Sequence, residues 1–110
     1  MSLINPKFTH SVLIEFKYGM KSLDPLLDLE DELRRILDET DIGYHDGHEI
    51  AMDDSDGKIF LFGTNAEAVY KLIEPILFSV DWMDGARVLL RFGDEADKSA
   101  KEIDFTLASV

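Results

Sequence analysis

Hydrophobic and polar positions repeat with two periods along the chain, and these periods predict strands and helices in turn. Residues 11–18 are apolar at every second position, which is typical of a strand with one apolar face. Residues 26–37 carry leucine and isoleucine at helical spacing, with Asp24 as the expected N-cap and Pro25 at the first helical position. Gly43 is the expected end of this helix.

The stretch from Lys58 to Gly93 predicts a strand, a helix and a second strand. The expected strands are residues 58–63 and 86–93, and the helix runs from Thr64 to about Val80. Thr64 and Glu67 have the spacing of a capping box. Pro75 removes one helical N–H group inside this run, so we expect a kink or a break into two short helices there.

Two shorter strands complete the predicted order. One covers residues 48–52, and the other covers residues 103–107, next to the fourth strand. Residues 53–57 (Asp-Asp-Ser-Asp-Gly) partly match a calcium-binding EF-hand loop, but methionine and glycine occupy the first and last ligand positions. We therefore interpret them as a hairpin turn, with weak adventitious calcium binding as the alternative.

The order β-α-β-β-α-β plus one strand predicts a single α+β domain over residues 1–110. Two strand–helix–strand units with right-handed crossovers form a ferredoxin-like antiparallel sheet with both helices on one face. The last strand adds to one edge as a C-terminal extension. The other face of the sheet is then left uncovered.

The composition narrows the classes of function. A net charge of −12 disfavours nucleic acid and anionic membrane surfaces as partners, and favours a basic protein. The chain has no cysteine, so disulfides and thiolate nucleophiles are excluded. No secretory signal and no apolar run of about 20 residues is present, which predicts a cytoplasmic protein. We expect no cofactor.

The uncovered sheet face is the first candidate site, either as a floor for a small ligand or as a surface for self-association into a homodimer. On the third strand the alternation leaves two alternatives, with either Ile59 and Leu61 or Phe60 and Phe62 pointing outward. Exposed aromatic residues in this position are typical of RNA-recognition domains, but the motif's glycine is missing here. The candidate residues of this face are Leu13, Glu15, Lys17, Phe60, Phe62, Arg87, Leu89 and Arg91.

Two further groups of residues carry candidate chemistry. His45, His48 and Glu49 are types that ligate transition metals, but we prefer to interpret them as a polar turn before a strand, with exposed histidines, and keep the metal site as the alternative. The first helix carries an acidic face, which we interpret as a solvated surface or, alternatively, as a protein-docking face. Its residues are Asp28, Glu30, Asp31 and Glu32.

Four short motifs within residues 41–93 resemble a group of small uncharacterised bacterial proteins. They are Asp46-Gly47-His48-Glu49, Phe60-Leu61-Phe62-Gly63, Glu74-Pro75-Ile76-Leu77 and the strand from Arg87 to Gly93. Phe62 and Phe92 stand where tyrosine is more usual in that group. The resemblance implies the ferredoxin-like fold and a bacterial cytosolic setting, favours His48 and Glu49 as site residues, and brings no established activity.

Three functions therefore remain open from the sequence. The first is a non-catalytic small-ligand-binding or regulatory module that self-associates. The second is an acidic interaction partner, such as an inhibitor or immunity-type protein for a basic toxin or nuclease. The third is a small enzyme or metal-binding protein that uses residues 45–49; no pair of carboxylates is marked as an acid and a base, so catalysis has the least support.

Overall fold

The computed structural model describes residues 8–52, 55–94 and 96–108, and these residues form a five-stranded antiparallel sheet with two α-helices. This α+β arrangement is consistent with a ferredoxin-like fold. The elements are β1 (His10–Lys17), α1 (Asp24–Thr40), β2 (Gly43–Ile50), β3 (Asp56–Gly63), α2 (Ala66–Phe78), the 3-10 turn η1 (Asp81–Met83), β4 (Arg87–Phe92) and β5 (Lys101–Thr106).

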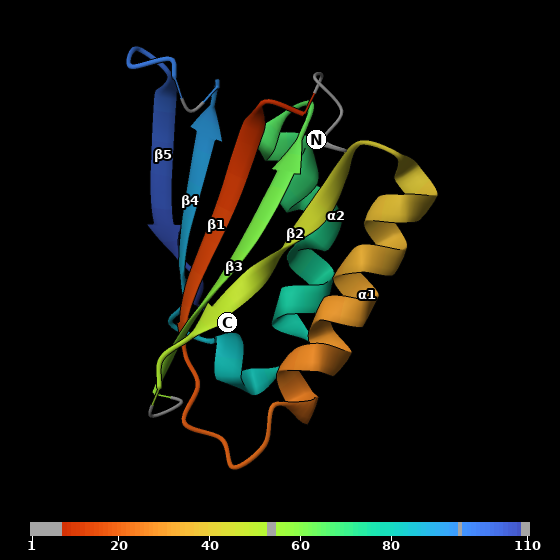
Figure 1. Ribbon diagram of the computed structural model, residues 1–110, viewed down its shortest axis with the longest axis vertical. Coiled ribbons are helices and arrows are strands. Elements are labelled where there is room, and N and C mark those ends of the chain that lie inside the picture. Colours follow the sequence, from red (N-terminus) through yellow and green to blue (C-terminus); the bar gives the residue numbers. More distant parts are fainter. Residues whose placement is uncertain (1–7, 53–54, 95, 109–110) are drawn as a thin grey trace.

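The strands lie in the order β2-β3-β1-β4-β5, so β1 is central and β2 and β5 are the edges. Every neighbouring pair is antiparallel. The prediction that the last strand lies beside the fourth is confirmed. In Figure 1 α2 lies behind the sheet, α1 lies to the right of β2, and the sheet face toward the viewer carries no helix. We call this uncovered side the open face.

The core lies between the sheet and the helices. Val12 lies directly opposite Leu61 on β3 and Leu90 on β4 in the strand register, and we describe such residues as level with one another. All three side chains are almost inaccessible to solvent. Ile59 and Leu61 are fully buried, so of the two alternatives for β3 the structure shows the one in which Phe60 and Phe62 point to the open face. Each fully buried aliphatic side chain of this kind contributes about 1.5–3 kcal/mol relative to exposure.

Both helices begin differently from the prediction. Asp24 is the first residue of α1 rather than its cap, and its N–H donates to the hydroxyl oxygen of Ser22 at 3.0 Å. Asn65, not Thr64, caps α2, because its side-chain oxygen accepts from the N–H of Ala68 at 2.9 Å. In each case the cap lies one residue from the predicted position: it is Leu23 for α1, whose side chain makes no cap hydrogen bond, and Asn65 for α2.

Pro75 does not break the second helix. The helix runs from Ala66 to Phe78 with Pro75 inside it, and a short 3-10 turn follows at residues 81–83. Buried side chains on both sides of the proline, including Ile73 and Leu77, hold this helix against the sheet. Tertiary packing therefore maintains a helix that local preference alone disfavours.

The segment after α1 is the largest departure from the expected boundaries. The helix ends at Thr40, Asp41 adopts the left-handed conformation that closes it, and Gly43 already starts β2. Strand β2 is thus longer than the predicted residues 48–52. Residues 53 and 54 of the expected hairpin turn lie outside the described residues. Neither α1 nor α2 is long and apolar enough to span a membrane.

Candidate functional site

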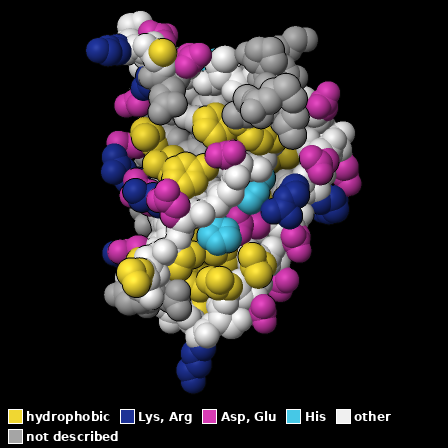
Figure 2. All heavy atoms as spheres, in the orientation of Figure 1, with side chains coloured by type: hydrophobic (Ala, Val, Ile, Leu, Met, Phe, Trp, Pro, Cys, Tyr) yellow, Lys and Arg dark blue, Asp and Glu magenta, His cyan; other side chains and the backbone are white. Residues whose placement is uncertain are grey.

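The open face carries an apolar strip across its three central strands. We define this strip as Leu13, Phe60, Phe62 and Leu89, all of which are half-buried. Leu13 is level with Phe60 on one side and Leu89 on the other, so the strip is continuous. Figure 2 shows hydrophobic side chains gathered on this side of the molecule, with charged side chains around them. Half-exposed apolar groups in one band are typical of a binding surface.

Aromatic side chains extend the strip toward β2. Tyr44 is level with Phe62, and its ring stacks on Phe62 with centroids 5.5 Å apart and on Phe8 with centroids 5.8 Å apart. The Tyr44 hydroxyl is buried and has no hydrogen-bond partner within the described part of the chain. Burial and the negative charge of Asp46 raise the pKa of Tyr44. The stack adds rigid apolar area to the open face.

One row of alternating charge crosses the open face beside the apolar strip. Glu49 on β2 is level with Lys58 on β3, Lys58 is level with Glu15 on β1, and Glu15 is level with Arg87 on β4. We call these four residues the charge row. Arg87 pairs with Asp104 at 2.8 Å and lies 3.9 Å from Glu15. Lys58 and Glu49 make no ion pair with any described residue, although they are direct neighbours across the strands.

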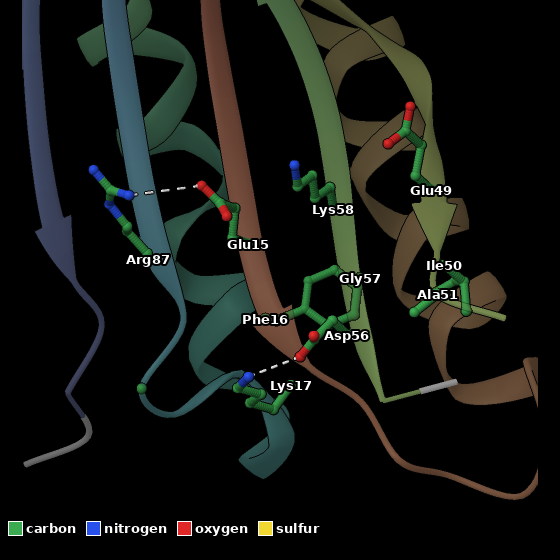
Figure 3. Close-up of a pocket in the computed structure, with 11 residues that line it drawn as sticks. Glu15, Phe16, Lys17, Glu49, Ile50, Ala51, Asp56, Gly57, Lys58 and Arg87 are labelled. Atoms are coloured by element: carbon green, nitrogen blue, oxygen red, sulfur yellow. Dashed lines mark hydrogen bonds and ion pairs between the residues drawn. The ribbon is translucent and has the colours of Figure 1, made fainter. Parts of the chain in front are cut away.

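A cavity of about 490 Å³ opens at this end of the face (Figure 3). The charge row lines it together with Lys17 and Asp56, which form an ion pair of 2.8 Å. Figure 3 shows the Lys58 side chain between Glu15 and Glu49, without a contact to either. A smaller cavity of about 250 Å³ overlies the apolar strip.

Gly57 forms part of the larger cavity for a steric reason. It is buried opposite Phe16, and an added Cβ would come within 2.5 Å of the Phe16 ring and 2.8 Å of Ile50. Only glycine leaves room for these two side chains at this level. The packing of the core therefore requires glycine at this position.

A second polar cluster lies on the helix side of the sheet. Glu30 of α1 is 2% exposed, and its two carboxylate oxygens contact His45 Nε2 and His48 Nδ1 of β2; the distance to His48 is 2.7 Å. The side chain of His45 is 5% exposed and that of His48 is 28% exposed. A buried carboxylate needs such donors, because leaving it unpaired away from water costs several kcal/mol.

The two contacts of His45 indicate the hydrogen-bond role of each ring nitrogen. A guanidinium nitrogen of Arg34 lies 3.4 Å from His45 Nδ1, and a guanidinium can only donate, so Nδ1 accepts. Nε2 then carries the hydrogen and donates to Glu30. This assignment comes from the hydrogen-bond network. The cluster joins α1 to the edge strand β2, and both carboxylate oxygens of Glu30 have an imidazole partner.

The structure separates the residues that the sequence grouped as metal ligands. His45 and His48 point toward α1, whereas Glu49 points to the open face and borders the cavity in Figure 3. Among residues 8–52, 55–94 and 96–108, no group of three or more histidine, aspartate or glutamate side chains is arranged to hold a metal ion. The histidines instead take Glu30 as their carboxylate partner.

Glu30 also corrects the predicted acidic docking face. Asp28, Asp31 and Glu32 are exposed, as expected, but Glu30 is buried and belongs to the core side of α1. A signal for this was present in the sequence. Glu30 lies four residues after Leu26 and three before Leu33, so it stands within the apolar stripe of the helix. A charge within such a stripe predicts a buried partner.

Comparison with known proteins finds no matching family model, no matching curated protein and no matching solved structure. The resemblance to small bacterial proteins therefore stays a prediction.

Proposed function

We propose that the protein is a non-catalytic binding or regulatory module of the cytoplasm that works as a self-associated pair, with the open face as the joining surface. The observation that carries this proposal is the apolar strip of Leu13, Phe60, Phe62 and Leu89, half-exposed on the three central strands. An antiparallel sheet tolerates water on one face, but its water-facing residues are then normally polar. Here the centre of that face is apolar.

The polar clusters give less support to an enzyme. Both carboxylate oxygens of Glu30 are occupied by imidazoles inside the molecule. Neither of the two cavities described above is lined by a histidine. A general acid or base must reach a substrate proton within hydrogen-bond distance. A surface function fits this arrangement better than a catalytic one.

A change in the middle of the strip tests the proposal. Leu13→Asp puts a charge among the apolar side chains, and Leu27→Asp, at an exposed leucine of α1, is the matched control. We expect light scattering to give a mass of two chains for the wild type and for Leu27→Asp at tens of micromolar, and of one chain for Leu13→Asp. Circular dichroism verifies that each variant is folded. A single-chain mass for the wild type at 100 µM would refute the proposal.

A second candidate is an acidic partner of a basic protein, such as an inhibitor of a toxin or nuclease. Asp28 and Glu32 favour it, because they are exposed on α1 and make no ion pair with a described residue. Binding of this kind weakens steeply with salt, since exposed charges are screened. It would be lost in a variant with Asp28→Lys and Glu32→Lys, and Leu13→Asp would leave it unchanged.

A further inference from the structure

The charge row is self-complementary, and we infer that the second copy packs its open face on the first around a two-fold axis that runs parallel to the strands, midway between β1 and β3. This inference rests on the proposed self-association and adds the geometry and the contacts of the pair. It places Lys58 of each chain against Glu15 of the other.

A two-fold axis between β1 and β3 exchanges β1 with β3 and β2 with β4. Because the row reads Glu49, Lys58, Glu15, Arg87 across these four strands, every position then meets the opposite charge. The central contact is Lys58 with Glu15 of the second copy. The outer contact is Glu49 with Arg87 of the second copy.

The neighbouring levels of the face agree with the same axis. One level further along the strands, Phe60 meets Leu13 of the second copy, so the centre of the apolar strip covers itself, whereas Leu89 meets Gly47 and Phe62 meets Ser11 of the second copy. On the other side of the row, Asp56 meets Lys17 of the second copy. Near the far end, Tyr44 meets Arg91 of the second copy, an aromatic ring against a guanidinium. Three levels thus give favourable contacts besides the charge row.

Other positions of the axis give unfavourable contacts. An axis along β1 sets Glu15 against Glu15 and Lys58 against Arg87, and an axis along β3 sets Lys58 against Lys58. An axis between β1 and β4 sets Phe60 against Asp104. Like charges in contact and a carboxylate on an aromatic ring both cost free energy, so these alternatives are disfavoured.

An axis perpendicular to the strands also fails. Centred on the charge row, it sets each charge against its own copy. Centred on the level of Leu13, it sets Arg87 against Arg91 and Lys58 against Phe62. The chosen axis is therefore the one that matches every charge of the row across the four strands β2, β3, β1 and β4 and also brings Leu13 and Phe60 of the two copies together.

The size of the contact predicts a weak, reversible pair. Four strands about 4.8 Å apart and about 26 Å long give a face of about 500 Å², or about 1,000 Å² for both chains. That is the lower limit of specific interfaces. Packed sheets are also rotated by about 30°, so contacts near the axis fit best. Lys58 and Glu15 are the charges nearest the axis, and they make the sharpest test.

Two single charge reversals, Lys58→Glu and Glu15→Lys, test the geometry by a mixing experiment. Alone, each variant sets like charges together at the axis, and we expect its dissociation constant to rise tenfold or more. In a one-to-one mixture, the introduced glutamate of one variant meets the introduced lysine of the other, and the native glutamate meets the native lysine. We expect a heterodimer of wild-type strength, measured by native mass spectrometry with one chain isotopically labelled. The double variant should pair with itself as the wild type does.

Matched controls keep the test specific. Lys71→Glu and Glu32→Lys make the same changes of charge on the helices, away from the open face, and should leave pairing unchanged. If the wild type pairs, Leu13→Asp does not, and both reversals pair normally, the axis is wrong and the proposed function stands. If the reversals weaken pairing and the mixture does not recover it, the axis is also wrong. A wild type that stays a single chain at 100 µM overturns both.

Discussion

Glu30 on α1 and His48 on β2 lie side by side, with Oε1 and Nδ1 2.7 Å apart, and this contact joins the first helix to the edge of the sheet. His45 occupies the other oxygen of the same carboxylate. One buried charge therefore fixes two positions of an edge strand. Loss of this charge should therefore destabilise the contact between the helix and the strand.

Replacement of Glu30 by glutamine should destabilise the protein by about 2–3 kcal/mol. The amide can accept from only one of the two imidazoles and sets an N–H group against the other, and each unmatched buried group costs about 1–3 kcal/mol. Urea unfolding followed by circular dichroism measures the change. Glu32→Gln, at an exposed position of the same helix, should change stability by less than about 0.5 kcal/mol. Equal effects of the two substitutions would show that the cluster adds no stability.

Replacement of Pro75 by alanine should stabilise the protein by about 1–2 kcal/mol. Alanine restores the missing helical N–H group and removes the crowding of the Lys71 carbonyl by the proline ring; together these two effects stabilise the helix by about 3 kcal/mol. The unfolded chain also gains conformational freedom, which lowers this stabilisation by up to about 1 kcal/mol. We expect the melting temperature to rise by about 5–10 °C. Lys71→Ala in the same helix is the control, with little change expected. A lower melting temperature for Pro75→Ala would show that the proline is required by the packing.

The tyrosines should make the folded state sensitive to alkali. Burial raises the pKa of Tyr70, with a hydrogen bond to Glu74 adding to the effect, and burial also raises the pKa of Tyr44. Because the folded state holds these protons more tightly, the stabilisation is complete below the unfolded pKa of about 10 and is lost as pH rises above it. Absorbance of tyrosinate at 295 nm should therefore show late titration. Tyr70→Phe should remove part of the late phase and reduce the loss of stability at high pH; an unchanged profile would contradict the assignment.

Salt should strengthen pairing of the wild type. Two chains of net charge −12 repel each other at long range, and salt screens this repulsion more than it screens the contacts buried in the interface. We expect the dissociation constant of the pair to fall by about threefold between 20 and 200 mM NaCl, as measured by sedimentation equilibrium. An acidic inhibitor bound to a basic partner predicts the opposite sign. Pairing that weakens with salt would show that the ion pairs between the two charge rows outweigh the long-range repulsion between the chains.

The sequence alone predicts the α+β class and much of the open face. Strand side chains alternate between the two faces, so the apolar positions of β1 and β4 already place Glu15, Arg87 and Leu89 on the uncovered side. The same alternation places His48 and Glu49 on opposite faces of the strand, so the pattern alone already separates these two candidate metal ligands. What a strand presents on each side is a local property, and local pattern predicts it.

Tertiary structure decided the rest, because those features depend on contacts between distant segments. On β3 the side chains of both faces are apolar. Only packing against the helices decides that Ile59 and Leu61 are buried rather than Phe60 and Phe62. His45 and His48, three positions apart, would point to opposite faces of a regular strand. A bulge between His45 and Gly47, with Gly47 at a φ of 149°, turns both toward Glu30. The sequence determined the faces of single strands, and the assembled sheet determined which residues meet across them, since pairing distant segments is settled by the free energy of the whole core.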